Sequence, residues 1–349
     1  MTIKLKRLHD QVVVITGATS GIGLVTARKA AHQGARLVLA ARSEEALSAL
    51  ASELSQAQHE ATIAVADVGS FNDVQNIALI ANEKFGGFDT WINNAGVSIY
   101  GNLAETSLED HRRLFETNYW GVVHGSLVAV QNLKTRGGAI INIGSVLSDR
   151  AIPVQGAYCA SKHAVKGFTD ALRMELEEAH LPISLTLIKP SAIDTPYKEH
   201  AQNYMPVEPN NPPPVYAPEV VADAILHCAE HPVRDVFVGG GGKGLSVIGQ
   251  LAPRLTDRLM EAAFFDMQQT ERLTDPMLHR SLHEPSGFST ERGTYEGHVA
   301  ESSAYTKASL HPWIIGGLFL TGVALAYLYQ RKHSSTSIGR SGSPSLVAF

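Results

Sequence analysis

The stretch that decides the fold is Thr16-Gly17-Ala18-Thr19-Ser20-Gly21-Ile22-Gly23. An apolar run over residues 12–15 precedes it and predicts a buried strand, and a helix is predicted over residues 22–31. The glycines therefore lie where a strand turns into a helix N-terminus, and backbone N–H groups there can face a pyrophosphate. Gly17 permits the tight turn, Gly21 lets a phosphate approach, and Gly23 allows close helix–strand packing.

A second motif lies farther along the chain, in Tyr158-Cys159-Ala160-Ser161-Lys162. Tyr158 and Lys162 are four residues apart and share one face of a predicted helix, where an ammonium can lower the pKa of a phenol. Neither motif alone identifies a site. Their occurrence together, in this order, indicates a dinucleotide-binding enzyme.

With these motifs the chain resembles the short-chain dehydrogenase/reductase family in its single-domain Rossmann form, from about Asp10 to Val238. Further family motifs fall in register: Asn93-Asn94-Ala95-Gly96, Asn118, Ser145, and Pro190-Ser191-Ala192-Ile193-Asp194-Thr195. The last departs from the family pattern, because Ser191 stands where Gly is commoner. Thr195 is kept.

Alternating strand and helix signals predict an α/β fold, a doubly wound parallel sheet in a three-layer αβα arrangement. Strands are expected over residues 12–15, 36–40, 61–66, 90–92, 139–143, 183–188 and 235–238, and helices over 22–31, 44–55, 71–85, 108–131, 157–179 and 218–230. The two longest helices match the pair that commonly joins subunits in the family, so the resemblance implies a homo-oligomer.

The resemblance assigns four catalytic residues. Tyr158 is expected to donate or accept the proton at a substrate oxygen, with Lys162 and an oxidised nicotinamide lowering its pKa. Ser145 is expected to hold the substrate oxygen. Asn118 is expected to keep a helix locally open, so that water links Lys162 to solvent.

The cofactor expected is NADP(H), with NAD(H) as the alternative. Ala41 occupies the position where NAD-preferring relatives usually carry an acidic residue, and the guanidinium of Arg42 beside Ser43 suits a 2′-phosphate. The predicted cofactor-binding residues are Gly17, Ser20, Gly21, Ile22, Gly23, Arg42, Ser43, Asp67, Val68, Asn94, Ala95, Gly96, Tyr158, Lys162, Pro190, Ile193 and Thr195.

Composition limits the other possibilities. The net charge of −5 over 349 residues gives no broad basic face for nucleic acid. Two cysteines, Cys159 and Cys228, suggest a reducing compartment, although a disulfide between them remains open. His279 and His283 have the spacing of two metal ligands on one helix face, but Pro276 and Pro285 bracket them, so no metal is expected.

The sequence predicts a Rossmann domain over residues 1–240, a helical extension and polar linker over 241–309, a transmembrane helix over 310–330 and a polar tail over 331–349. Residues 239–243 read as a flexible exit from the last strand, and residues 275–307 as a partly ordered linker. Apolar residues at Leu251, Leu255, Leu259, Ala263 and Met267 form a helical stripe, expected to pack on the core or a partner subunit, with a membrane surface as the alternative.

Residues 313–329 carry no charge, with Trp313 at one end and Arg331 and Lys332 beyond the other. This stretch predicts a C-terminal membrane anchor, with a buried terminal helix as the alternative. Residues 1–10 lack a signal peptide, so the catalytic domain is expected on the cytoplasmic side, although the basic residues alone favour a cytoplasmic C-terminus.

A Pro-rich insert over residues 197–216 occupies the place of the family's substrate lid and is rich in apolar and aromatic residues. The predicted function is NADP(H)-dependent interconversion of a carbonyl and a hydroxyl group on a small lipophilic substrate. A dinucleotide-binding regulatory or scaffold protein is the alternative from another class. Epimerase or dehydratase chemistry is a third, and it belongs mainly to relatives with a larger substrate domain.

Overall fold

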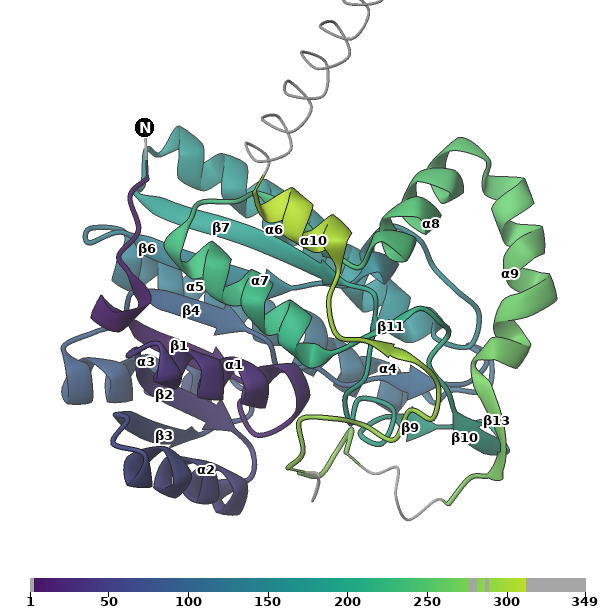
Figure 1. Ribbon diagram of the computed structural model, residues 1–349, viewed down its shortest axis with the longest axis horizontal. Helices are drawn as coiled ribbons and strands as arrows, with labels where there is room; N and C mark the ends of the chain where they lie inside the picture. The colour runs from purple at the N-terminus through teal and green to yellow at the C-terminus, as the bar shows by residue number, and fades with distance from the viewer. Residues whose placement is uncertain (1–2, 276–280, 286–288, 312–349) are drawn as a thin grey trace, which may run out of the picture. The chain divides into compact units, whose positions relative to one another are not determined.

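The computed structural model describes residues 3–275, 281–285 and 289–311 (Figure 1). Met1–Thr306 form one compact unit and Lys307–Phe349 a second. Apart from its first two residues, the predicted transmembrane stretch 310–330 lies outside the described residues, as does the tail 331–349. Among the helices that are described, none is long and apolar enough to cross a membrane.

The core is a seven-stranded sheet in the order β12-β7-β6-β4-β1-β2-β3, and every neighbouring pair is parallel. Its strands are β1 (Val12–Thr16), β2 (Arg36–Ala41), β3 (Ala61–Val65), β4 (Thr90–Asn93), β6 (Gly138–Ile143), β7 (Ile183–Pro190) and β12 (Asp235–Val238). All residues of β1 and β7 are buried, as expected for inner strands of a parallel sheet that is covered on both faces.

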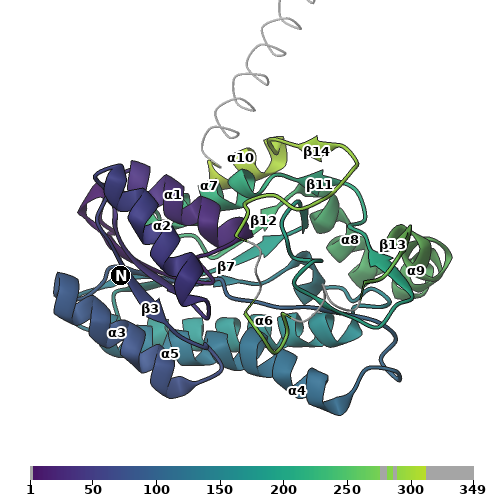
Figure 2. The same ribbon diagram turned by 90° about the horizontal axis from the view of Figure 1, so that it is seen from below.

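Helices cover both faces of this sheet (Figure 2). One layer holds α1 (Gly21–His32), α2 (Glu44–Gln56) and α7 (Pro218–Glu230); the other holds α3 (Phe71–Phe85), α5 (Gly121–Leu133) and α6 (Gly156–Glu178). The predicted doubly wound three-layer fold is therefore confirmed.

The long helix expected over residues 108–131 is interrupted. It consists of α4 (Leu108–Phe115), a π-helical turn η2 (Glu116–Trp120) and α5. Asn118 lies in this turn. Such insertions widen the backbone ladder and leave room for side-chain contacts to the backbone.

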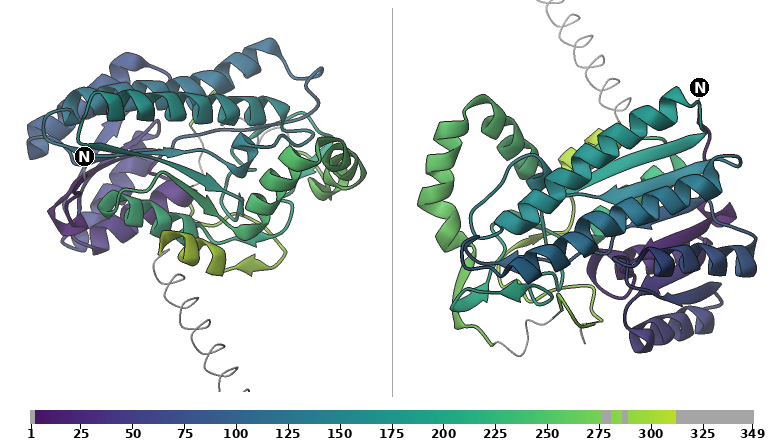
Figure 3. Two further views of the ribbon diagram at one scale, coloured as in Figure 1. Left: turned by 90° about the horizontal axis from the view of Figure 1, so that it is seen from above. Right: turned by 180° about the vertical axis from the view of Figure 1, so that it is seen from behind.

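Two further helices, α8 (Gly240–Leu251) and α9 (Pro253–Met267), extend from the end of β12 (Figure 3). The flexible exit expected at residues 239–243 is instead the start of α8. In α9 the buried residues are Thr256 and Met260, whereas Leu255 and Leu259 are 57% and 54% exposed and Leu251 is 81% exposed. The stripe therefore does not pack on the core of this chain, which α9 contacts through its neighbouring face. Packing on a partner subunit and contact with a membrane surface both stay predictions.

Short strands complete the fold. They are β5 (Ile99–Tyr100), β8 (Ala192–Ile193), β9 (Gln202–Asn203), β10 (Val207–Pro209), β11 (Val215–Tyr216), β13 (Gln269–Leu273) and β14 (Val299–Ala300), followed by α10 (Ala304–Leu310); two 3₁₀ turns are η1 (Leu8–Asp10) and η3 (Val146–Ser148). β14 pairs with β11, which in turn pairs with β8. The described part of residues 275–307, expected to be a partly ordered linker, thus packs on the Rossmann core.

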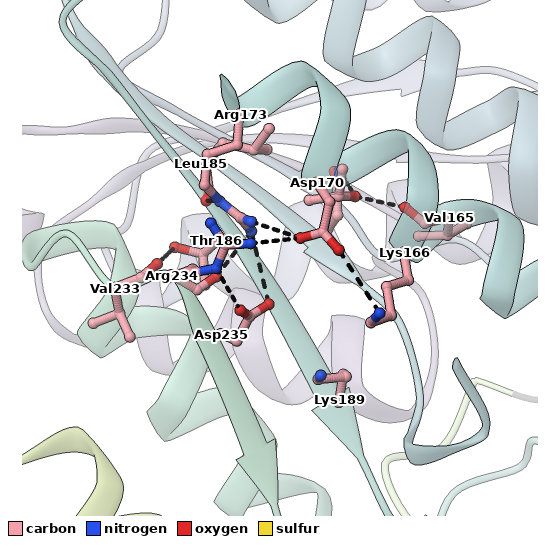
Figure 4. A network of polar contacts seen from close by, with 12 residues as sticks. Val165, Lys166, Asp170, Arg173, Leu185, Thr186, Lys189, Val233, Arg234 and Asp235 are labelled. Carbon is pink, nitrogen blue, oxygen red and sulfur yellow. Dashed lines mark hydrogen bonds and ion pairs between the residues drawn. The ribbon is translucent and has the colours of Figure 1, made fainter. Parts of the chain in front are cut away.

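A polar network anchors α6, the helix that carries Tyr158 and Lys162, to the adjoining strands (Figure 4). The buried Arg173 donates to the Leu185 carbonyl at 3.0 Å, to the Asp170 carboxylate at 2.9 Å and to the Arg234 carbonyl at 3.1 Å. Lys166 also reaches Asp170, at 3.8 Å. The Asp170 contacts lie within α6, whereas the bonds to Leu185 in β7 and to Arg234, directly before β12, hold α6 against these two strands.

Candidate active site

The predicted site residues gather at the carboxyl edge of the parallel sheet. β1 leads into the glycine-rich turn, β4 into Asn94, β6 into Ser145, and β7 ends at Pro190. Parallel strands direct all these ends to one edge, and ligands of open α/β sheets bind in the crevice there.

The glycine-rich turn is packed too tightly for side chains. A Cβ atom on Gly23 would lie 2.0 Å from the Gly17 carbonyl oxygen, and Gly17 itself has a φ of +64°. The Asn94 side chain donates to the carbonyls of Thr16 and Gly17, both at 3.0 Å. Gly17 and Gly23 thus shape the turn, while Asn94 holds it from β4.

Tyr158, Lys162 and Ser145 line one cavity of about 490 Å³. Lys162 Nζ donates to the Ile143 carbonyl at 2.8 Å and lies 5.6 Å from the centre of the Tyr158 ring. The Ser145 hydroxyl accepts from the Leu147 N–H at 3.1 Å, so the start of η3 fixes its position.

The Asn118 side chain bonds mainly to the backbone of a loop residue beside this cavity. Its Oδ1 accepts from the Val97 N–H at 2.8 Å, and its Nδ2 donates to the Val97 carbonyl at 2.9 Å and to Ser161 Oγ at 3.2 Å. It therefore joins the π-helical turn to the helix residue that precedes Lys162.

Burial controls the protonation of the two central groups. It raises the pKa of Tyr158 to about 12, whereas contacts with the hydroxyls of Tyr197 and Ser145 act in the opposite direction. Burial lowers the pKa of Lys162 to about 8. Both side chains are therefore neutral over a wider pH range in this cavity than they are in water.

Tyr197 is a site residue whose polar role sequence reasoning missed, because it was considered only as apolar lid surface. Its ring packs edge to face on Tyr158, with centres 5.4 Å apart. Its buried hydroxyl makes no hydrogen bond of normal geometry within the described residues, although it lies close enough to lower the pKa of Tyr158.

Most of the predicted residues line one or both of two hollows, which share Gly96, whereas Gly21 and Gly23 line neither. The large cavity is lined by Ile22, Asn94, Gly96, Ser145, Tyr158, Lys162, Pro190, Ile193 and Thr195, and a smaller hollow of about 100 Å³ by Gly17, Ser20, Arg42, Ser43, Asp67, Val68, Ala95 and Gly96. A dinucleotide is an elongated ligand, and this row of residues from Arg42 to Tyr158 fits one.

Apolar side chains dominate the rest of the large cavity. The insert after Thr195 contributes Tyr197, Pro212, Pro213 and Pro214, and α8 and α9 contribute Leu245, Ile248 and Phe264. The contribution of α8 and α9 was not predicted from the sequence. The spacing of apolar residues over α8 and α9 predicts helices, but it does not indicate which helix face lines the cavity.

Charged groups at the smaller hollow are paired. The Asp67 carboxylate accepts from the Arg113 guanidinium and from the Gly69 N–H. Arg42 donates to the carbonyl oxygens of Ser281 at 2.7 Å and Glu284 at 2.9 Å. Burial lowers the pKa of Arg42, with Arg113 acting in the same direction and Asp67 against it. Ser43 Oγ caps α2 by accepting from the Ala46 N–H.

Of the two histidines with metal-ligand spacing, the structure describes only His283. His283 pairs with the Asp110 carboxylate at 2.7 Å, and His279 lies outside the described residues. In the part of the chain that the structure describes, no group of three His, Cys, Asp or Glu side chains could hold a metal ion.

Because Lys162 is buried, we expect the stability of the folded protein to depend on pH. Because its pKa is about 8 in the folded protein against an ordinary 10.5, the unfolded chain binds this proton more tightly. The resulting destabilisation is complete below about pH 8 and disappears as the pH rises to 10.5. Urea unfolding without added nucleotide should show the wild-type protein gaining about 3 kcal/mol relative to Lys162→Met between about pH 7 and pH 10. Lys166→Met is the control, because Lys166 lies one turn along α6 and is more exposed. The wild-type protein should show no such gain in stability relative to Lys166→Met. A parallel pH dependence of wild type and Lys162→Met would contradict this assignment.

Comparison with known proteins agrees with this geometry. The family model described as short chain dehydrogenase matches residues 11–205. An uncharacterized oxidoreductase YxnA of Bacillus subtilis is 47% identical over 92% of this chain and 91% of its own length. The mouse dehydrogenase/reductase SDR family member 7B is 34% identical over 72% of this chain and 81% of its own.

Two solved structures share the fold. An alcohol dehydrogenase from Thermococcus sibiricus, complexed with 5-hydroxy-NADP, is 28% identical with a TM-score of 0.58, covering 65% of this chain and 95% of the other. A short chain dehydrogenase/reductase from Burkholderia phymatum, in complex with NAD, is 26% identical with a TM-score of 0.63, covering 79% and 100%. The fold, the row of motif residues along the sheet edge and these relatives lead to one conclusion: the chain belongs to the short-chain dehydrogenase/reductase family and is an oxidoreductase that binds a nicotinamide dinucleotide.

Proposed function

We propose that this protein interconverts a carbonyl and a hydroxyl group on a small lipophilic substrate, with NADP(H) as cofactor and Tyr158 as the acid or base. The observation that carries this proposal is the large cavity, in which Ser145, Tyr158 and Lys162 meet walls of Pro, Leu, Ile and Phe side chains. Such a site binds an apolar molecule and places few polar groups at its reacting atom. A regulatory scaffold, the alternative, has no need of this arrangement.

The bound nicotinamide supplies or accepts a hydride. In the direction of reduction, Tyr158 donates its phenolic proton to the substrate oxygen while Ser145 holds that oxygen by a hydrogen bond. Lys162, beside the Tyr158 ring, stabilises the phenolate that remains. Burial raises the pKa of Tyr158, so these contacts are needed to bring it toward neutral pH.

Tyr158→Phe removes the phenolic proton but keeps the ring that packs on Tyr197. Turnover of a lipophilic carbonyl with NADPH should fall at least about 100-fold. The dissociation constant of NADPH, measured by fluorescence titration, should change by less than about twofold, since the ring remains in place. Tyr119→Phe, which removes a phenol from the π-helical turn, is the control and should keep its turnover. Near-normal turnover by Tyr158→Phe would exclude the phenol as the proton donor.

The proposed preference for NADP(H) rests on Arg42 at the end of β2, with Ser43 beside it and no carboxylate at Ala41. Arg42→Ala should weaken NADPH binding by about 1.5–3 kcal/mol and NADH binding much less, because only NADPH carries the 2′-phosphate. The ratio of the two dissociation constants is the decisive quantity. If the wild-type protein binds NADH as tightly as NADPH, the preference is wrong.

We also propose that residues 313–329 anchor the protein in a membrane, with the catalytic domain on the cytoplasmic side. Assembly into a homo-oligomer is a separate prediction and stays one. Support for the anchor comes from the uncharged apolar sequence with aromatic ends. The full chain should sediment with membranes and need detergent for release, whereas a chain ending at His311 should be released without it. Recovery of the intact chain in the soluble fraction without detergent would refute the anchor.

A further inference from the structure

A segment of the C-terminal extension lies across the adenosine end of the predicted cofactor site. We call the described residues 281–285 and 289–294 the strap (light green in Figure 1). The family model ends at residue 205, so the strap lies outside the part of the chain that it matches.

The first part of the strap is fixed in the protein core. Leu282 is fully buried and belongs to the apolar cluster that includes Val97 and Leu114. Arg113 Nε donates to the Leu282 carbonyl at 3.2 Å, and His283 pairs with Asp110 at 2.7 Å. The strap therefore has its own anchoring contacts on α4.

Arg42 connects this part of the strap to the cofactor residues. Its guanidinium donates to the carbonyls of Ser281 and Glu284, at 2.7 and 2.9 Å. The guanidinium that faces the predicted 2′-phosphate position is thus oriented by the strap. Bonds from a charged donor are stronger than those between neutral groups, so this contact is a substantial one.

The second part of the strap contacts the glycine-rich turn. The Gly21 N–H donates to the Thr290 carbonyl at 2.9 Å, and Glu291 pairs with Arg28 of α1 at 2.7 Å. Gly293 packs directly on Thr195, whose carbonyl oxygen would lie 2.4 Å from a Cβ at that position. The strap therefore spans from the end of β2 to the segment after β7.

Between the strap and the sheet edge a hollow remains. Its lining includes Arg42, Asp67 and Gly17 on one side and Ser281 and Pro285 on the other. At about 100 Å³ it is smaller than the 300–1,000 Å³ typical of small-molecule sites. The strap thus closes over the hollow without filling it, and it must shift outward when an adenosine group enters or leaves.

From these contacts we infer that the strap is part of the cofactor site: it closes over the adenosine half of the bound dinucleotide and limits the rate of its release. The inference rests on dinucleotide binding by this site. It assigns Arg42 two partners, the strap carbonyls and the cofactor, and it makes cofactor exchange depend on residues far along the chain from the Rossmann motifs.

The test measures release of NADPH and of NADH from the full-length protein, by stopped-flow displacement followed in nucleotide fluorescence. Glu291→Gln removes the pair with Arg28, and Leu282→Ala removes the buried anchor. Each should raise the dissociation rate of both nucleotides about tenfold, with a similar loss of affinity. Glu296→Gln is the matched control: it removes an exposed pair with Arg272 and should leave release unchanged.

Trypsin cleavage after Arg292 gives a second readout that needs no variant. Saturating NADPH should slow cleavage at this residue of the strap in the wild-type protein. Unchanged release in Glu291→Gln together with unchanged cleavage would overturn the inference, as would tighter binding by the variants, since that result would mean that the strap competes with the cofactor. Failure of the wild-type protein to bind either nucleotide would instead contradict the proposed function as well.

Discussion

The close contact between the β1–α1 turn and its surroundings is the constraint on which the site depends. No side chain fits at Gly23, because a Cβ atom there would lie 2.0 Å from the Gly17 carbonyl oxygen, and Asn94 bonds the same turn from the end of β4. This packing brings the N-terminus of α1 to the sheet edge, where its N–H groups and dipole favour an anionic ligand. A looser turn would separate the N–H groups of this turn from Ser145, just after β6, and from Tyr158 and Lys162 on α6.

Burial gives the catalytic pair its chemistry and also its cost. A phenol and an ammonium placed in an apolar cavity both lose hydration, so the neutral forms of Tyr158 and Lys162 are favoured over the charged ones. The Ile143 carbonyl supplies one fixed acceptor for the lysine. The shift brings the pKa of Lys162 closer to neutral pH, whereas it moves the pKa of Tyr158 away from it, and contacts with the hydroxyls of Tyr197 and Ser145 act against that rise.

The additions beyond the Rossmann core complete the site from two sides. α8 and α9 supply Leu245, Ile248 and Phe264 to the large cavity, while strap residues Ser281 and Pro285 line the smaller hollow, where we propose that the adenosine half of the cofactor binds. Both come from the same C-terminal extension. One extension thus shapes both halves of the site, and this gives a physical reason why it packs on the core instead of forming a separate linker.

The sequence by itself determined the sheet, its helical layers and the motif residues, because strand and helix periods and glycine turns are local properties of the chain. It also singled out Tyr158 and Lys162 through their spacing, and Ser145 and Asn118 through the resemblance to the family. Only the tertiary structure decided that Tyr197 contacts Tyr158, that the apolar stripe of α9 faces away from the core, and that residues 281–285 and 289–294 meet the predicted cofactor residues. The strap binds Arg42 and Gly21 through the carbonyls of Ser281, Glu284 and Thr290. Every residue carries such a carbonyl, so these contacts leave no pattern in the side chains from which they could be predicted.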